Sequence, residues 1–371
     1  MAGARGADRR TRRPPGTYVG QPFSAPLLYR AKAPLRIGLA GGGTDVSPYA
    51  DRFGGAILNA TVSLFATATL EPRDDGRVVL DSRDLGERVE LDVADQLPTG
   101  GELTLLRGVY NRVARDYRLP PGGLTLTTEV DAPKGSGMGT SSTVTVAVLG
   151  AFAEWLRLPL GEYDVARLAY DIERVDLRMA GGRQDQYAAT FGGFNFMEFG
   201  AGEKVIVNPL RVRRSYVKEL EHNLVLYYTG TSRLSAAIIE RQAAAFAKTP
   251  TAGDANDSLD AAHALKAQAV RMKEAVLTGQ LTAIGGLLDY GWQAKKRMAS
   301  GITNPLIDEL YEAALAAGAT GGKISGAGGG GFMTFYCPGT TRHSVTDALT
   351  RFGGEVRPFT FVQEGMVSWV G

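Results

Sequence analysis

Residues 133–143, PKGSGMGTSST, place three glycines at alternate positions directly before four hydroxyl side chains. Glycines let backbone N–H groups approach an anion closely, and a helix that begins after them presents the positive end of its dipole. The hydroxyls of residues 140–143 could cap such a helix, bind phosphate oxygens or donate one ligand to Mg²⁺, which prefers oxygen. The stretch therefore indicates a nucleotide phosphate site, with a purely structural turn as the alternative. The sequence has no G-x-x-x-x-G-K-[ST] motif, so the loop is not a Walker P-loop.

A second glycine run, KISGAGGGGF, occupies residues 323–332 and contains a formal G-x-G-x-x-G motif. In a dinucleotide-binding unit a strand precedes this motif and a helix follows it, whereas here the predicted order is reversed. The run is therefore not a dinucleotide fingerprint. Its glycines still imply a close approach of the backbone, either to a neighbouring strand and helix or to a ligand beside the first loop.

Two carboxylates stand out in the segment between the glycine runs. Glu173 and Asp185 lie twelve residues apart, and Asp185 is flanked by Gln184 and Gln186 and enclosed by glycine pairs. A solvated surface position is the simpler interpretation of a carboxylate, and it holds for Glu173 taken alone. A charge enclosed by glycines, amides and aromatic rings is expected to be ion-paired or chemically active. Asp185 is therefore a candidate catalytic residue.

Alternating and helical apolar patterns predict the elements that must position these residues. Strands are expected at 35–39, 55–72, 124–130, 223–228 and 331–336. Helices are expected at 103–117, 143–156, 234–248, 258–278, 281–298 and 304–318. Because strands and helices mix without a regular βαβ alternation, we expect an α+β fold in two lobes, with a boundary near residue 200.

The composition limits the classes of function. The chain has 371 residues, 44% hydrophobic and 22% charged, which is enough for two packed domains. Its 41 Lys and Arg against 39 Asp and Glu leave a net charge of +2, so no overall field points to nucleic acid, and no apolar run could span a bilayer. The single Cys337 excludes an internal disulfide, and three scattered histidines give no zinc signature. We therefore expect a cytoplasmic protein with small-molecule partners, and neither nucleic acid nor membrane.

Three ordered motifs resemble those of the GHMP kinases, the superfamily of galactokinase, homoserine kinase, mevalonate kinase and phosphomevalonate kinase. They are APLRIGLAGGGTD at 33–45, PKGSGMGTSST at 133–143 and KISGAGGGGF at 323–332. The resemblance extends from about Ala31 to the end of the chain. It implies an ATP-binding N-terminal domain with a left-handed βαβ crossover over residues 29–200 and a ferredoxin-like C-terminal domain over 201–371, with the site between them. Residues 1–28 are predicted to be a flexible Arg-rich tail, because they lack the apolar core of a secretory signal.

The resemblance also implies roles for individual residues. Asp185 would lie next to the accepting hydroxyl with Arg36 beside it, and Ser141 and Glu173 would hold Mg²⁺. The ATP phosphates would be bound by Pro133, Gly135, Ser136, Gly137, Met138, Gly139, Thr140, Ser141 and Ser142. The acceptor would be bound by Gly42, Gly43, Thr44, Asp45, Arg183, Arg233, Gly328 and Gly329. These residue types suit phosphoryl transfer, which depends on positioning and charge neutralisation, with Asp185 orienting or deprotonating the nucleophile.

The identity of the acceptor depends on departures from the family pattern. Galactokinase has G-E-H-T-D in the first motif where this chain has Gly42-Gly43-Thr44-Asp45, so galactose is not expected. Four stretches together, at residues 32–49, 181–195, 227–236 and 292–315, are similar to the D-glycero-D-manno-heptose 7-phosphate kinase group. This resemblance implies transfer to the anomeric hydroxyl of a heptose 7-phosphate. The product would be the 1,7-bisphosphate used in nucleotide-activated heptose synthesis. Two alternatives stay open: a GHMP kinase for another sugar, of fucose type or a heptose epimer in a specialised pathway, and a nucleotide-binding module without catalysis.

A phosphorylated acceptor needs a second anion site away from the ATP loop. Arg233 is the first candidate because it follows Thr231 and Ser232 in a glycine and hydroxyl context. Further candidates are Lys295 with Lys296, Arg178 and Arg183, each of which could instead be a solvated surface charge. The sequence also leaves open whether the protein forms a homodimer.

Overall fold

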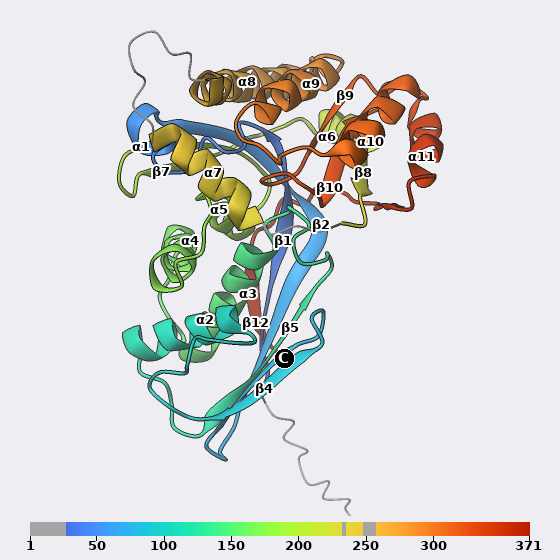
Figure 1. Cartoon of the computed structure of the whole chain (residues 1–371). Helices are drawn as coiled ribbons and strands as arrows, with labels where there is room; N and C mark the ends of the chain where they lie inside the picture. Colours follow the sequence, from blue (N-terminus) through green and yellow to red (C-terminus); the bar gives the residue numbers. More distant parts are fainter. Residues whose placement is uncertain (1–26, 232–234, 248–256) are drawn as a thin grey trace, which may run out of the picture.

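The computed structural model describes residues 27–231, 235–247 and 257–371. Within them the predicted α+β class is confirmed, because two separate sheets are flanked by helices (Figure 1). Nearly all of the tail predicted at residues 1–28 lies outside the described residues. No helix in the described part of the chain is long and apolar enough to cross a membrane.

The larger sheet is built on a long antiparallel centre. Its strands are β1 (Tyr29–Ala40), β2 (Gly55–Pro72), β3 (Arg77–Ser82), β4 (Glu87–Asp92), β5 (Gly123–Val130), β6 (Phe194–Phe199), β7 (Val205–Pro209) and β12 (Val367–Val370). The main path runs β12-β1-β2-β5-β3-β4, and β6 pairs with both β2 and β7. Only β3 and β5 pair in parallel, and the chain between them passes through β4 and α2 (Thr104–Asp116). This crossover is the βαβ unit of the larger sheet.

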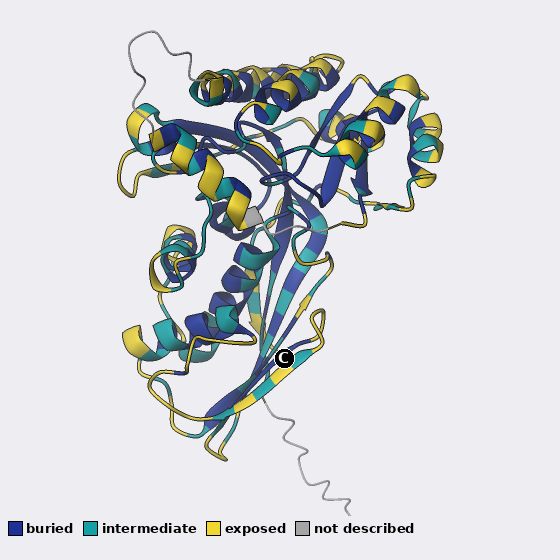
Figure 2. Ribbon diagram, viewed as in Figure 1, coloured by how far each residue is buried: buried dark blue, intermediate teal, exposed yellow. Residues whose placement is uncertain are grey.

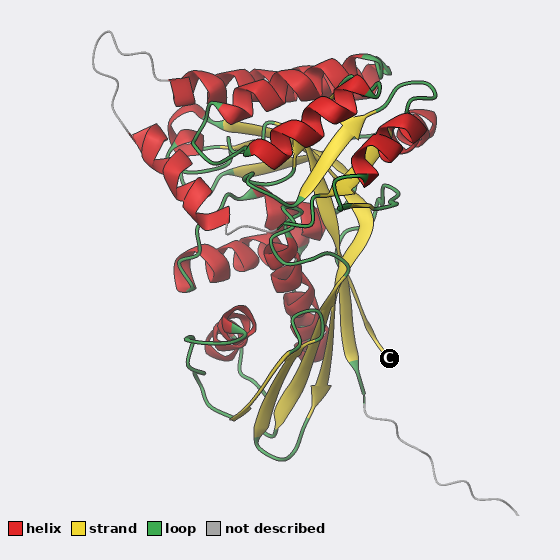
Figure 3. Cartoon of the chain, turned by 45° about the vertical axis from the view of Figure 1, so that its right-hand side comes forward, coloured by secondary structure: helices red, strands yellow, loops and turns green. Residues whose placement is uncertain are grey.

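The strand β2 has two burial patterns. Its first eight residues are all buried, whereas buried and partly exposed residues alternate from Ser63 onwards. Continuous burial indicates that both faces of a strand are covered, and alternation indicates one covered face. Figure 3 shows the reason, since helices lie on only one side of the lower part of the sheet. The predicted bounds of this strand, 55–72, are confirmed.

The smaller sheet is fully antiparallel. It contains β8 (Leu224–Tyr228), β9 (Gly321–Ile324), β10 (Phe332–Tyr336) and β11 (Glu355–Val356) in the order β11-β8-β10-β9. Between β8 and β9 lie α7 (Ser235–Ala247), α8 (Asp257–Thr278), α9 (Ala283–Lys296) and α10 (Pro305–Ala316), and between β10 and β11 lies α11 (Arg342–Thr350). Numbered along the chain, this is the strand order 4-1-3-2. The ferredoxin-like lobe implied by the family resemblance is therefore present.

Two strands of the larger sheet come from beyond residue 200. They are β7 and β12, and β12 pairs with the beginning of β1, where Val370 faces Tyr29 and Val367 faces Lys32. β1 starts at Tyr29, where it pairs with both β2 and β12, and is longer than the predicted strand at 35–39. The division of the chain into domains near residue 200 stays a prediction.

Helix α3 (Thr140–Leu156) packs against the middle of the larger sheet. Ten of its residues are buried, and it lies against β1, β2 and α5 (Gln184–Phe191) (Figure 2). The burial predicted for an all-round apolar helix is confirmed, and the helix begins three residues before the expected 143. The remaining helical elements are α1 (Tyr49–Phe53), α4 (Glu162–Asp171), the π-helical turn η1 (Ile172–Asp176) and α6 (Arg214–Asn223).

Candidate functional site

The two glycine runs pack directly against each other. A Cβ atom at Gly137 would lie 2.5 Å from the carbonyl oxygen of Ser325, and one at Gly326 would lie 2.8 Å from the Cα of Gly137. The N–H of Phe332 donates to the carbonyl of Ser136 at 2.9 Å. These contacts join β10 of the smaller sheet to the loop before α3. The second run is therefore glycine-rich at least partly because two backbones meet there.

The loop before α3 leaves the start of that helix open. Gly135, Gly137 and Gly139 have φ angles of 76°, 79° and 79°, which other residues adopt at a cost. No side chain caps the first turn of α3, although four hydroxyls stand there. The hydroxyl of Ser136 is fully buried and has no hydrogen-bond partner in the structure. Uncapped N–H groups and an unpaired hydroxyl are the donors that phosphate oxygens require, so the loop fits a nucleotide phosphate.

Two of the hydroxyls turn instead toward Glu173, which lies in the turn η1 and is fully buried. Ser141 donates to Glu173 Oε1 at 2.9 Å, Ser142 donates to Oε2 at 2.7 Å, and the amide of Gln186 also donates to Oε2. The nearest cation is Arg174, whose Nη2 is 3.9 Å from Oε2. The carboxylate is thus held in place by neutral donors.

The oxygen atoms of Ser141 and Glu173 fit Mg²⁺. This ion prefers hard oxygen ligands and is usually bound through one or two carboxylates together with substrate phosphates and water. Within the described ranges, no group of three or more His, Cys, Asp or Glu side chains could hold a metal by itself. An ion shared with bound phosphates is compatible with the Ser141 and Glu173 pair.

Asp185 lies in the first turn of α5 and pairs with Arg36 of β1. Arg36 Nε and Nη2 lie 2.8 Å and 2.6 Å from Asp185 Oδ1, and Nη1 donates to the carbonyl of Gly137 at 2.7 Å. A Cβ atom at Gly139 would lie 3.1 Å from the carboxyl carbon of Asp185. Arg36 is buried, whereas a quarter of the Asp185 side chain is exposed. A partly accessible carboxylate is therefore fixed against the end of the phosphate loop.

Asp45 is fixed beside the same segment. Its Oδ2 accepts hydrogen bonds from the backbone N–H groups of Arg183 at 2.8 Å and Gln184 at 3.1 Å, immediately before Asp185. A Cβ atom at Gly182 would lie 1.9 Å from the same oxygen, so only glycine permits this approach. Asp45 is therefore hydrogen-bonded to the backbone that leads directly into Asp185.

Comparison with known proteins decides the family. The chain matches the model of the GHMP kinases N terminal domain at residues 104–193 and that of the GHMP kinases C terminal domain at 272–354. Over 340 residues it is 45% identical to D-glycero-alpha-D-manno-heptose 7-phosphate kinase of Campylobacter jejuni, covering 92% of this chain and 98% of that protein. The chain belongs to the GHMP kinase family.

Solved structures agree with this assignment. The kinase is 44% identical to a D-glycero-D-manno-heptose 1-phosphate kinase from Bacteroides thetaiotaomicron, with a TM-score of 0.77 and coverage of 92% of this chain and 98% of that one. It is 42% identical to a putative sugar kinase from Campylobacter jejuni, with a TM-score of 0.76 and coverage of 93% and 98%. A phosphotransferase fold of this family is therefore shown for the whole described chain.

Several residues predicted to bind the acceptor use their side chains within the kinase. The hydroxyl of Thr44 donates to the carbonyl of Gly41 at 2.8 Å. The guanidinium of Arg183 donates to the carbonyl of Gly200 at 2.9 Å and to Asp51 at 2.7 Å. These contacts shape the segments around Asp45, and a direct role of either side chain toward the acceptor stays a prediction.

The remaining predicted residues are placed as follows. Gly329 donates its N–H to the carbonyl of Ile302 at 2.8 Å, and a Cβ atom at Gly328 would lie 2.7 Å from the same oxygen, so both glycines accommodate a neighbouring backbone. Arg178 has a positive φ of 53° in the chain between η1 and α5. Arg233 lies outside the described residues.

Two lysines complete the site, and one of them was not predicted. Lys295 of α9 donates to the carbonyl of Gly42 at 3.1 Å, and Lys323 of β9 donates to that of Gly38 at 2.8 Å. Both side chains are buried, with 5% and 8% of their surface exposed. Burial lowers the pKa of Lys295 to about 8 although Asp45 opposes the shift, and burial together with the charges of Lys295 and Arg36 lowers the pKa of Lys323 to about 7. A signal for Lys323 was available, since it opens the second glycine run.

The lowered pKa of Lys323 predicts a pH dependence of stability. Between about pH 7 and its ordinary pKa of 10.5, the unfolded chain binds more protons than the folded one, so the free energy of unfolding rises with pH in this window. Below about pH 7 both states are protonated, and the full burial penalty remains. We expect Lys323→Met to flatten the rise that the unliganded kinase shows between pH 7 and pH 9 in urea unfolding. An unchanged slope in the variant would show that Lys323 is not the group that titrates.

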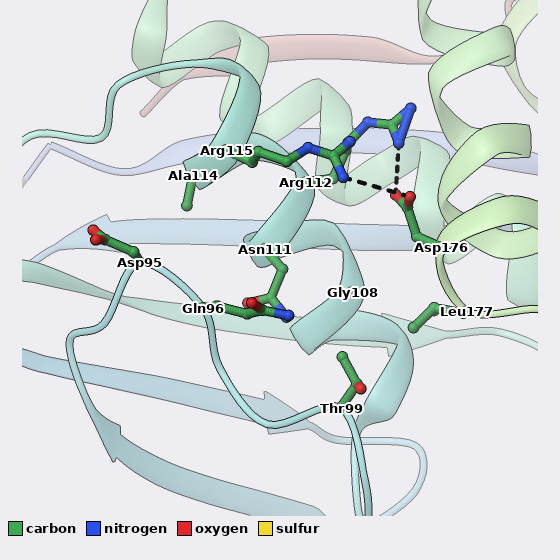
Figure 4. A pocket seen from close by; sticks show the side chains of 10 residues that line it. All are labelled: Asp95, Gln96, Thr99, Gly108, Asn111, Arg112, Ala114, Arg115, Asp176 and Leu177. Carbon is green, nitrogen blue, oxygen red and sulfur yellow. Dashed lines mark hydrogen bonds and ion pairs between the residues drawn. The ribbon is translucent and has the colours of Figure 1, made fainter.

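A hollow of about 560 Å³ lies away from these residues, between α2 and the turn η1 (Figure 4). It is lined by side chains such as Asn111, Arg112 and Asp176. Arg112 donates to Asp176 and Asp116 at 2.7 Å each, so its charge is already paired. None of the residues predicted for catalysis or substrate binding lines this hollow.

Proposed function

We propose that this GHMP kinase transfers the γ-phosphate of ATP to the anomeric hydroxyl of a heptose 7-phosphate. The product is the heptose 1,7-bisphosphate, a precursor for nucleotide-activated heptose synthesis. The observation that carries the proposal is the Asp185 carboxylate, which Arg36 holds against the glycine loop before α3. A relative that is 45% identical along almost its whole length acts, by its name, on this substrate.

The donor side is the loop from Pro133 to Ser142. Its glycine backbone, the buried hydroxyl of Ser136 and the uncapped start of α3 bind the phosphates of ATP. Ser141 and Glu173 would hold Mg²⁺, which would neutralise charge on the phosphate oxygens. Arg36 adds a fixed positive charge between the loop and Asp185. Such preorganised charges stabilise the dispersed charge of a loose phosphoryl-transfer transition state.

The acceptor side is organised by two carboxylates. Asp185, which pairs with Arg36, accepts the hydrogen bond of the anomeric hydroxyl and takes its proton as the bond to phosphorus forms. Asp45 has its Oδ2 fixed by two backbone N–H groups, and it orients a further sugar hydroxyl. The non-catalytic alternative is not favoured, because relatives at 44–45% identity along nearly their whole length are named as heptose phosphate kinases.

The substrate is tested by coupled ADP release with ATP and Mg²⁺. The acceptors are free hexoses, fucose, mevalonate, and heptose 7-phosphates and 1-phosphates of different stereochemistry. Both heptose phosphates are included because one relative is named a heptose 7-phosphate kinase and another a heptose 1-phosphate kinase. We expect turnover with a heptose 7-phosphate and, by ³¹P NMR, a product with a new anomeric phosphate. Turnover confined to an unphosphorylated sugar or to a heptose 1-phosphate would overturn the proposal. A homodimer and a cytoplasmic location stay predictions.

A further inference from the structure

We propose that Lys295 and Lys323 form a buried subsite for the phosphate group that the acceptor already carries. The inference rests on the proposed function, because it places a phosphorylated sugar beside Asp185. Lys295, in α9, was already a candidate for this site from the sequence, whereas Lys323, in β9, was not.

The first argument is the unpaired charge of the two ammonium groups. An ammonium has three N–H donors, and the structure gives each lysine one hydrogen bond, to the neutral backbone carbonyl of Gly42 or Gly38. Among the described residues, neither ammonium lies within 4.0 Å of a carboxylate. A buried charge is costly unless it is paired and hydrogen-bonded. An anionic ligand is the partner that this arrangement suits.

The second argument is the charge balance around the lysines. Of the neighbouring carboxylates, Asp185 pairs with Arg36, whereas Asp45 accepts two backbone N–H groups and acts on Lys295 by its charge without a direct ion pair. Three buried or nearly buried cations, Arg36 and the two lysines, therefore face two carboxylates. When both lysines are protonated, the acceptor side carries an excess of positive charge, and a bound anion would favour these protonated forms. A neutral sugar would leave this excess uncompensated, whereas a sugar phosphate compensates it.

The third argument is position. Arg36 and Gly38 lie on the same strand, β1, and at a rise of about 3.3 Å per residue Lys323 contacts the strand about 7 Å beyond the catalytic pair. Lys295 contacts the loop that follows. A Cβ atom at Gly42 would meet no atom within 4 Å, so there is space beside this loop. An acceptor with its anomeric end at Asp185 would thus direct its far end toward the two lysines.

The amide side chain of Gln242 lies beside the same loop, with its oxygen toward Gly43. A Cβ atom at Gly43 would lie 2.8 Å from the ammonium nitrogen of Lys295 and 3.4 Å from Oε1 of Gln242 in α7. Gln242 is 1% exposed, and its Nε2 has no hydrogen-bond partner in the structure. A buried amide donor without a partner is rare, and a phosphate oxygen would satisfy it. The ATP phosphates are assigned to a different element, the start of α3.

The subsite is tested with Lys295→Met and Lys323→Met, which keep the length of the side chain and remove the charge. The control is Lys273→Met, because that ammonium lies 4.6 Å from the centre of the Phe196 ring. We measure kcat/KM for heptose 7-phosphate and for the same heptose without phosphate, and the KM for ATP. The preference for the phosphorylated acceptor is expected to fall at least tenfold in both site variants and to stay unchanged in the control. An equal loss with both acceptors, or a loss that appears only as a raised KM for ATP, would overturn the subsite while leaving the proposed function intact.

A second measurement tests the subsite independently of whether a heptose phosphate is a substrate. Inorganic phosphate is titrated in the presence of ADP and Mg²⁺, so that the glycine loop is occupied, and the thermal unfolding midpoint is recorded. We expect phosphate to raise the midpoint of the wild-type kinase and of Lys273→Met, and to raise it less or not at all in the two site variants. Equal stabilisation of all four proteins would overturn the subsite. Failure of the acceptor panel with a positive result here would overturn only the proposed function.

Discussion

Asp185→Asn is expected to lower kcat by about 10²- to 10⁴-fold, the range that a positioned general base contributes. The amide keeps the shape of the side chain but carries no charge for Arg36 and cannot take a proton from the accepting hydroxyl. Because Arg36 also donates to the carbonyl of Gly137, the phosphate loop should remain in place and the KM for ATP should change little. Steady-state kinetics with ATP and the acceptor varied in turn measure both quantities.

The matched control for this variant is Asp81→Asn in β3. Asp81 is more deeply buried than Asp185, and it pairs with Arg88 at 3.0 Å and Arg83 at 3.2 Å on the larger sheet. The Asp81→Asn substitution removes a comparable ion pair far from the glycine loops. It should therefore lower the stability of the protein without lowering kcat. If Asp185→Asn retained more than a tenth of the wild-type kcat, Asp185 would not be the general base, and its carboxylate would only orient the acceptor.

Glu173→Gln is expected to raise the Mg²⁺ concentration that gives half-maximal activity by at least about tenfold. The carboxylate offers two anionic oxygens, one to Ser141 and one to Ser142, whereas the amide offers one neutral oxygen. Loss of this charge weakens the attraction to a hard cation and misplaces the Ser141 hydroxyl. Activity measured against Mg²⁺ at fixed ATP reports the change directly.

A suitable control for Glu173→Gln is Glu198→Gln in β6, because Glu198 is exposed and accepts a hydrogen bond from Asn208 at 3.2 Å. Its Mg²⁺ dependence should match that of the wild type. If Glu173→Gln showed a lower kcat at every Mg²⁺ concentration with the same half-maximal value, Glu173 would be a structural support of α3 and not a metal ligand.

Features encoded within one segment were predicted well from the sequence. The strand at 55–72 and the buried helix after the glycine loop follow from local apolar patterns, and the structure has both. The alternate glycines at 135, 137 and 139 were also informative, because left-handed backbone geometry is a local property. These features sufficed to indicate a phosphate loop and, through the family resemblance, the fold.

Features that depend on a distant partner were not predicted. Arg183 bonds to Asp51, and β12 pairs with β1, across separations that no local pattern encodes. The second glycine run left two interpretations open, and only its packing on Gly137 shows that a neighbouring backbone accounts for part of it. The position of Lys323 at the start of the second glycine run was a signal in the sequence, but its burial and its contact with Gly38 depend on the fold.

The pairing of β12 with β1 also constrains how the protein folds during translation. The outer edge of β1 is completed by residues 367–370, more than three hundred residues later in the sequence. At about 5–20 residues per second, a ribosome needs on the order of tens of seconds to reach them. During this interval the nascent chain carries an open strand edge of the kind that recruits other chains. Residues at the far end of the chain thus protect a strand that is among the first to be synthesised.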